Sequence, residues 1–143
     1  MKLRAGGAGV SHARTDITVR DLAFTIDEPA ERGGTNTGPA PTEAALAALI
    51  GCTNVIGQRC ADALGIDVGH LSIDVAADLD RRGVTLAEEV EVPFVSLKLT
   101  VTSDGPASAE ELQRVAAEVA KYCPLSKLFR AAGTDVEEIW QKA

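Results

Sequence analysis

Apolar and polar residues alternate in the first part of the chain, and a period of two is typical of β-strands. Within residues 15–26 the alternation shifts by one position at Asp21. The apolar positions on its two sides are Ile17, Val19, Leu22, Phe24 and Ile26. The shift predicts two strands joined by a tight turn.

A stretch rich in proline and glycine separates these strands from the main helix. Residues 27–41 contain three prolines and three glycines, which is typical of a long ordered loop or a flexible lid. Pro41 suits the first position of a helix and Glu43 suits its positive end, so we expect a helix from Pro41 to about Gly65. Residues 44–56 are apolar on nearly every side. A single chain of 143 residues hardly covers such a helix alone, so the pattern predicts a homodimer wrapped around it.

The second half of the chain returns to strands before a further helix. Residues 71–75 alternate, and residues 90–101 mix a short apolar run with clean alternation, so each is predicted to be a strand. Residues 78–83 form the polar connection between them. A capping box at residues 108–111 opens a second helix, whose apolar residues recur at helical spacing. Residues 135–140 predict a last edge strand or a short helix.

Cys123 marks the end of this second helix. A residue before proline is biased away from the helical region, so we expect a stop at Cys123 and a short third helix from Pro124 to Ala132. Cys123 then caps the third helix. Backbone N–H groups at the start of that helix, with Lys121 and Lys127 nearby, favour a depressed pKa for the Cys123 thiol.

Composition narrows the class of protein. The length suits one compact domain over residues 1–143. One Trp, one Tyr and three Phe offer little surface for stacking on bases, and a net charge of −7 opposes a polyanion, so no nucleic-acid partner is expected. No apolar run reaches the length of a signal peptide or a membrane span, which predicts a cytoplasmic protein without a membrane partner. The two histidines lie apart without ligand spacing, so neither a metal nor a cofactor is expected.

Three cysteines in a compartment that keeps thiols reduced indicate chemistry or packing rather than a disulfide framework. Cys52 and Cys60 lie on the same predicted helix, eight residues and a rise of about 12 Å apart. A disulfide needs Cα atoms closer than about 7 Å, so this pair is excluded and Cys60 is interpreted as a packing residue. A pairing of Cys52 with Cys123 is geometrically open.

Seven short segments of the chain resemble the OsmC/Ohr family, in its broad OsmC-like branch. They are Asp27 to Pro29, Gly33 to Gly34, Gly38 to Glu43, Leu46 to Thr53, Ala61 to Gly65, Val92 to Phe94 and Tyr122 to Ser126. The match runs from about residue 17 to the end of the chain. Taken together, the two cysteine motifs and the helix that opens with proline before the first of them are specific for this family.

The resemblance implies an α+β fold, the OsmC-like fold, in which two chains intertwine and long central helices pack between antiparallel sheets. It also implies a peroxidase for organic hydroperoxides. In that mechanism Cys52 attacks the peroxide and becomes a sulfenic acid, and Cys123 condenses with it to a disulfide. A dithiol reductant, such as a reduced lipoyl group, reopens the disulfide. This cycle fits the oxidation chemistry of thiols with a resolving partner.

Activation of the nucleophile is the point where the chain departs from the family pattern. Cys52 lies within a helix and gains nothing from a helix terminus, so it needs a nearby cation. The resemblance implies an arginine from an early segment, held by a glutamate at the start of the helix. Arg14, ahead of Arg20, is the candidate arginine, with a solvated surface role as the alternative for each. Glu43 is the candidate glutamate, although it stands nine residues before Cys52 where the family has ten.

Thr42 occupies the position that the family gives to the glutamate, and one residue on a helix is a rotation of about 100°. Glu43 therefore also has a simpler interpretation, as a residue that compensates the helix dipole. Two functions follow from these alternatives. The first is the peroxidase. The second is a noncatalytic OsmC-like dimer that binds a small apolar ligand or serves as a slow thiol redox sensor.

Overall fold

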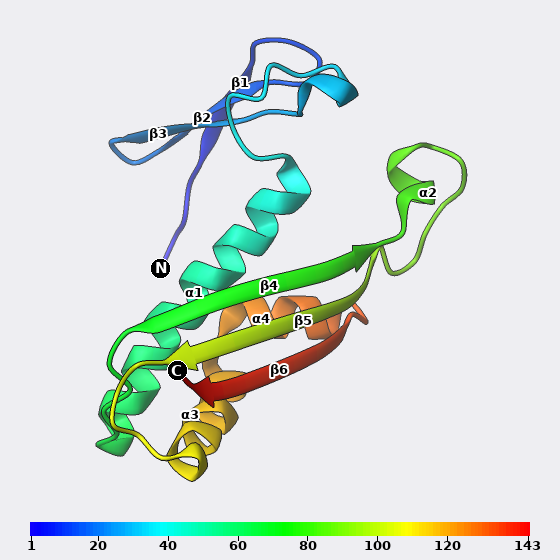
Figure 1. Ribbon diagram of the computed structural model, residues 1–143. Helices are drawn as coiled ribbons and strands as arrows, with labels where there is room; N and C mark the ends of the chain where they lie inside the picture. Colours follow the sequence, from blue (N-terminus) through cyan, green and yellow to red (C-terminus); the bar gives the residue numbers. More distant parts are fainter. The chain divides into compact units, whose positions relative to one another are not determined.

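The computed structural model of the protein describes residues 1–143 (Figure 1). The chain forms two compact units, residues 1–47 and residues 48–143. The single domain expected over residues 1–143 stays a prediction.

The first unit contains a small antiparallel sheet in the order β1-β2-β3. Its strands are β1 (Gly6–Gly9), β2 (Thr15–Val19) and β3 (Leu22–Ile26). The predicted pair of strands is confirmed as β2 and β3, and Arg20 makes their tight turn with a positive φ of 57°. We did not predict β1, because its four residues are glycine and alanine and carry no alternation of apolar and polar side chains.

The segment after β3 is an ordered loop built around a buried carboxylate. It contains one turn of 3-10 helix, η1 (Ala30–Arg32). The carboxylate of Asp27 is inaccessible to solvent and accepts hydrogen bonds from the backbone N–H groups of Glu28, Thr35 and Thr37 and from both threonine hydroxyls. Of the two predicted alternatives, an ordered loop and a flexible lid, these bonds favour the first.

The main helix, α1 (Pro41–Leu64), is confirmed at both ends. Gly65 ends it with a positive φ of 68°, while the N–H of Ile66 donates to the carbonyl of Ala61, as in a Schellman motif. Of its 24 residues only five are buried within the chain: Leu49, Thr53, Gly57, Cys60 and Ala61. Much of the apolar surface of α1 is thus uncovered in a single chain.

Helix α1 also bears on the expected absence of a membrane span, through its length and composition. It is long and apolar enough to cross a membrane, although we expected no such stretch. The core helix of a soluble protein passes the same test, so the property is weak support for a membrane span. The helix is not apolar without a break, because polar residues such as Thr53, Asn54 and Gln58 interrupt it.

The second unit contains a sheet in the order β4-β5-β6. Its strands are β4 (Leu71–Leu79), β5 (Phe94–Ser103) and β6 (Asp135–Lys142). Strands β4 and β5 are antiparallel, but β5 and β6 are parallel, so the expectation of purely antiparallel sheets is wrong for this pair. The two helices between β5 and β6 carry the chain back along the sheet, which a hairpin turn cannot do.

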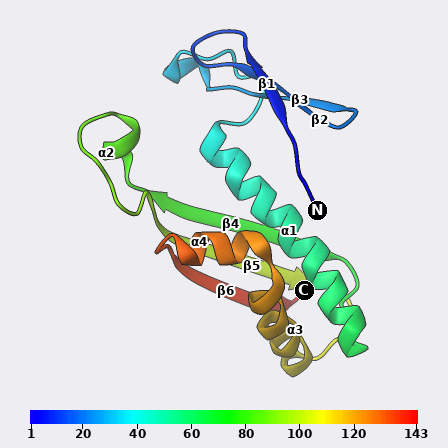
Figure 2. The ribbon, with the colours of Figure 1, turned by 180° about the vertical axis from the view of Figure 1, so that it is seen from behind.

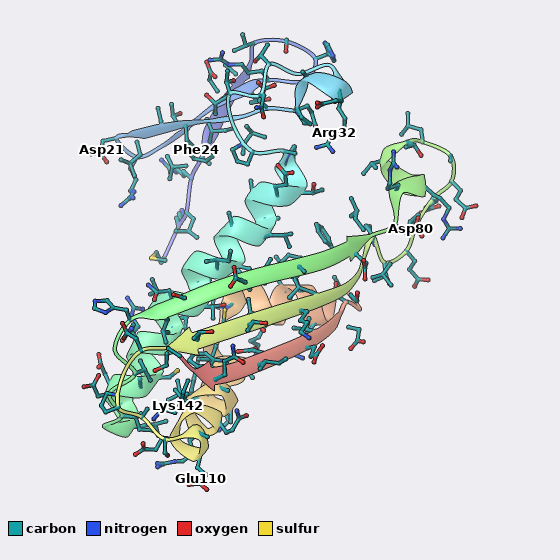
Figure 3. All side chains as sticks on the ribbon, in the orientation of Figure 1. Asp21, Phe24, Arg32, Asp80, Glu110 and Lys142 are labelled. Atoms are coloured by element: carbon teal, nitrogen blue, oxygen red, sulfur yellow. The ribbon has the colours of Figure 1, made fainter.

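The connections around β5 differ from the predicted ones. Residues 90–93 lie outside the strand, because Pro93 lacks an N–H for the ladder and its carbonyl instead accepts from the N–H of Asp80. Asp78 and Leu79 complete β4, and the expected polar connection contains a one-turn helix, α2 (Arg81–Val84). Asp80 caps α2 and lies at the end of β4 in Figure 3. The last segment, residues 135–142, is a strand, one of the two predicted alternatives.

Two helices and part of α1 cover one face of the second sheet (Figure 2). The helices are α3 (Ala109–Tyr122) and α4 (Pro124–Ala131), as predicted. The capping box of α3 is present: Ser108 accepts from the N–H of Glu111, and the Glu111 carboxylate accepts from the N–H of Ser108. The core between helices and sheet consists of aliphatic side chains, among them Leu97, Leu99, Val101, Leu112, Val115 and Val119.

Close approach of α1 to this sheet depends on a glycine. A Cβ at Gly57 would lie 3.0 Å from Cη2 of Trp140 on β6 and 3.1 Å from Cδ1 of Leu71 on β4. Both distances are tighter than most real contacts of a Cβ atom. Gly57 therefore sets how near α1 lies to the sheet, and with it the position of Cys52 five residues earlier.

Candidate functional site

The cysteines of the two cysteine motifs meet in the second unit. The Sγ atoms of Cys52 on α1 and Cys123 at the end of α3 lie 3.3 Å apart, although 71 residues separate them in the chain. A disulfide bond measures about 2.05 Å, so the two groups are thiols in contact. The pairing of Cys52 with Cys123, which the sequence left open, is therefore a direct contact in the structure. Cys60 is a free, buried cysteine in the packing role that we expected.

Cys123 holds the junction between two helices. It ends α3 with an extended backbone (φ −69°, ψ 110°) and begins α4, where Pro124 takes the first helical position. Its Sγ accepts a hydrogen bond from the N–H of Ser126 at 3.5 Å, so the predicted cap is confirmed. Proline after the cysteine is the local reason for this break, because it disfavours helical backbone at the residue before it.

The predicted ionisation of Cys123 is wrong in direction. Burial raises the pKa of the Cys123 thiol to about 11, with a further contribution from the neighbouring Cys52. The N–H groups of Ser126 and Leu125 act in the opposite sense but are outweighed. Cys123 is fully inaccessible to solvent. The loss of hydration destabilises its thiolate more than the N–H groups at the helix terminus stabilise it. The residue type and the cap alone did not reveal this burial.

The lysines near Cys123 do not supply the expected positive charge. The Lys121 ammonium pairs with Glu118 on the same helix, and Lys127 Nζ lies 3.5 Å from the carbonyl of Lys121. Both lysines are exposed. Their role is therefore on the surface of α3 and α4 and not in contact with the buried sulfur.

The pair of thiols is asymmetric. Cys123 is buried and directs its S–H toward the sulfur of Cys52, while Cys52 is only half-buried. Cys52 is therefore suited to react with a reagent that arrives from solvent. Cys123 is suited to react afterwards with Cys52, and it stays protonated until then.

The two candidate activating residues have other partners in the first unit. Arg14 Nε donates to the carboxylate of Asp16 at 3.0 Å, and Glu43 Oε2 accepts from the backbone N–H of Ala40 at 2.8 Å. No ion pair joins Arg14 to Glu43. The Glu43 bond satisfies a free N–H just ahead of α1, which matches its alternative interpretation at the positive end of the helix. Arg20 is exposed in the turn between β2 and β3.

A polar network behind Cys123 was missed in the sequence. On α4, Arg130 Nε donates to Oγ of Ser126 at 3.4 Å, and its Nη1 donates to the carbonyl of Val136 at 3.3 Å. Nη2 lies 3.7 Å from the carboxylate of Glu138, which also accepts from the indole N–H of Trp140 at 2.7 Å. The spacing of four residues from Ser126 to Arg130 was visible, and residues 135–140 were predicted as a strand or a short helix, but the parallel pairing with β5 that brings Glu138 here was not predicted.

An apolar cleft of about 360 Å³ lies between α1 and α3. Its lining is Ile56, Arg59, Cys60, Ala63, Leu64, Glu118 and Tyr122. Burial, and then the nearby Glu118 carboxylate, raise the pKa of the Cys60 thiol, which keeps it protonated. This cysteine is therefore unsuited to act as a nucleophile at neutral pH.

Comparison with known proteins places these features in context. The sequence model of the OsmC family, described as OsmC-like protein, matches residues 34–138. No curated protein matches the chain. An OsmC-like protein from Mycoplasma pneumoniae has a TM-score of 0.84 at 17% identity, with 100% of this chain and 98% of that chain covered.

Two further solved structures carry names that refer to hydroperoxides. The organic hydroperoxide resistance protein OsmC from Legionella pneumophila has a TM-score of 0.74 at 19% identity, covering 99% of this chain and 97% of its own. The organic hydroperoxide resistance protein OhrB of Bacillus subtilis has a TM-score of 0.69 at 22% identity, covering 98% of each chain. At these identities the similarity shows a common α+β fold.

Proposed function

Because the family match over residues 34–138 shows that the chain belongs to the OsmC family, we propose that it is a thiol-dependent peroxidase that reduces organic hydroperoxides. The observation that carries the proposal is the contact of 3.3 Å between the Sγ atoms of Cys52 and Cys123. Two free thiols at this distance form a disulfide after a small movement, once one of them has been oxidised.

The first step uses the more accessible thiol. The thiolate of Cys52 attacks the terminal oxygen of the hydroperoxide, the O–O bond breaks, and the organic part leaves as an alcohol after taking up a proton. Cys52 is then a sulfenic acid. The half-buried position of Cys52 supports this role, since the peroxide has to reach the sulfur from solvent.

The second step uses the buried thiol. The sulfur of Cys123 attacks the sulfur of the Cys52 sulfenic acid, the S–O bond breaks, and hydroxide leaves as water with the thiol proton. The pKa of about 11 keeps Cys123 protonated before oxidation, so it does not compete for the peroxide. An external dithiol, of which a lipoyl group is one example, then reduces the disulfide and is itself oxidised to a cyclic disulfide.

Arg14 and Glu43 are proposed as the groups that activate Cys52, on the strength of the family resemblance. Arg14 pairs with Asp16, and Glu43 accepts from the N–H of Ala40. These contacts lie at the surface and at the end of a helix, so both side chains can take other partners. A second copy of the chain is also proposed, because most of the apolar surface of α1 is uncovered in one chain. The proposed setting is the cytoplasm, where reduced dithiols are available.

The test is peroxide consumption with a dithiol reductant, for an alkyl hydroperoxide and for hydrogen peroxide. We expect faster loss of the alkyl hydroperoxide, abolished in Cys52→Ser. In Cys123→Ser we expect one oxidation per chain and then a stall or overoxidation of Cys52. Cys60→Ala is the matched control, because it removes a thiol of the same helix outside the pair, and it should retain turnover. Consumption no faster than the reductant blank contradicts the proposal and favours the noncatalytic dimer.

A further inference from the structure

We propose that Arg130 is a positioning residue for the resolving cysteine. Its guanidinium holds Ser126, whose backbone N–H faces Cys123 Sγ, and it places a positive charge on the face of α4 that carries the sulfur. The inference rests on the proposed function, since Cys123 bears negative charge only when the dithiol reacts.

Helix geometry brings the three residues together. Cys123, Ser126 and Arg130 are spaced by three and four residues, so they share one face of α4. Side chains on a helix tilt toward its N-terminus, which directs the long arginine side chain back toward the cap. The bond of 3.4 Å from Arg130 Nε to Ser126 Oγ is the direct result. Ser126 itself is buried, with 2% of its surface exposed, so this bond is sheltered from water.

Glu138 fixes the guanidinium in this place. Its side chain is only 8% exposed, because it points from β6 toward the helices, and its carboxylate lies 3.7 Å from Arg130 Nη2. The indole of Trp140 donates to the same carboxylate at 2.7 Å. A carboxylate that is buried without a cation is costly, so Arg130 and Glu138 need one another. The arginine thus has a fixed position, although 41% of its side chain is exposed.

The chemistry at Cys123 explains why such a cation is useful. When the external dithiol reduces the disulfide, one of its thiolates attacks the sulfur of Cys52, the S–S bond breaks, and Cys123 leaves as a thiolate that then takes up a proton. The second thiol of the reductant displaces the first from Cys52 and releases the oxidised dithiol. In the resolving step Cys123 has to give up its proton to attack. The backbone N–H of Ser126 acts to lower the pKa of the Cys123 thiol and so favours both steps, and Arg130 holds the serine that carries it.

The other cations on these elements make no hydrogen bond to Ser126. Cys123 is in contact with the titratable group of Cys52 on α1. The charged or titratable side chains adjacent to it in sequence on α3 and α4 are Lys121, Tyr122, Lys127 and Arg130. On the neighbouring elements, Arg59 of α1 lines the cleft with Glu118 and Tyr122, and Glu138 of β6 pairs with Arg130. Lys121 is paired with Glu118, and Lys127 lies against the carbonyl of Lys121. Among these cations, only Arg130 donates a hydrogen bond to Ser126, the residue whose backbone N–H donates to the sulfur of Cys123.

The experiment follows Cys52–Cys123 disulfide reduction by dithiothreitol from pH 6 to 9, after oxidation with diamide. We expect Arg130→Met to slow reduction about threefold to tenfold at each pH, since a thiolate of higher pKa leaves more slowly and exposure weakens the effect, while the thiolate fraction of dithiothreitol sets the pH dependence. Arg130→Lys should keep at least half of the wild-type rate. Lys127→Met is the matched control, a cation of the same helix without a bond to Ser126, and it should match the wild type.

Ser126→Ala keeps the backbone N–H and removes only the hydroxyl that Arg130 holds, so it should slow reduction about twofold to threefold even where Arg130→Met fails to fold. Rates equal to the wild type in the folded variants overturn the proposal. An equal loss in Lys127→Met also overturns it. Diamide replaces the peroxide in this experiment. If the protein consumes no hydroperoxide but the variants show the expected changes, the proposed peroxidase function is wrong and the role of Arg130 is supported.

Discussion

Gly57 offers a sharp test of how the main helix is seated on the second sheet. A methyl group at this position would lie 3.0 Å from Trp140 and 3.1 Å from Leu71, and both are large side chains in the core region of the sheet. Trp140 is 4% exposed, so its ring has little room to move. The Gly57→Ala substitution therefore pushes α1 and the sheet apart.

Two terms of opposite sign set the magnitude. Alanine is more favourable than glycine within a helix by about 1 kcal/mol. Overpacking of a filled core costs about 1–3 kcal/mol. The sum predicts that Gly57→Ala lowers the free energy of unfolding by up to about 2 kcal/mol. The separation of Cys52 and Cys123 should also increase, because Cys52 lies on the same helix.

Chemical denaturation followed by the fluorescence of Trp140, the only tryptophan, measures this change. Gly51→Ala is the control on the same helix, because a Cβ added there would meet no atom within 4 Å and only the gain of about 1 kcal/mol applies. A loss of stability in Gly51→Ala that depends on protein concentration points to a second copy on this face. A Gly57→Ala protein that gains the same stability as Gly51→Ala refutes the seating of α1 on the sheet.

Two further predictions concern a buried carboxylate and a helix cap. Hydrogen bonds, above all from Thr35, hold the pKa of Asp27 well below its usual range. The contribution of Asp27 to stability is therefore complete above the unfolded pKa of about 3.9 and is lost as the pH falls below that value. In acid unfolding followed by circular dichroism, Asp27→Asn should be less stable than the wild type at neutral pH and should lose stability less steeply below about pH 4, and equal slopes contradict this. Ser108→Ala removes one half of the capping box of α3 and should lower the free energy of unfolding by about 1 kcal/mol. Glu110→Ala, at an exposed first-turn position that points away from the helix layer in Figure 3, is its control, and an equal loss in both variants refutes the capping effect.

Local sequence determined the elements of this protein. The proline at 41 and the glycine at 65 bound α1, the capping box opens α3, and the proline at 124 breaks the chain between α3 and α4. These signals act through backbone geometry and hydrogen bonds within a few residues, so they are legible without a tertiary structure. Alternation likewise predicted β4 and most of β5, because a strand with one buried face repeats every two residues.

Tertiary structure alone decided the chemistry of the site. The contact of Cys52 with Cys123 depends on how α1 packs beside the α3–α4 junction, and the raised pKa of Cys123 depends on burial by distant residues. The parallel course of β6 also came from the structure, and with it the arrival of Glu138 beside Arg130. Desolvation and contacts between remote segments are properties of the packed chain, and no window of neighbouring residues contains them.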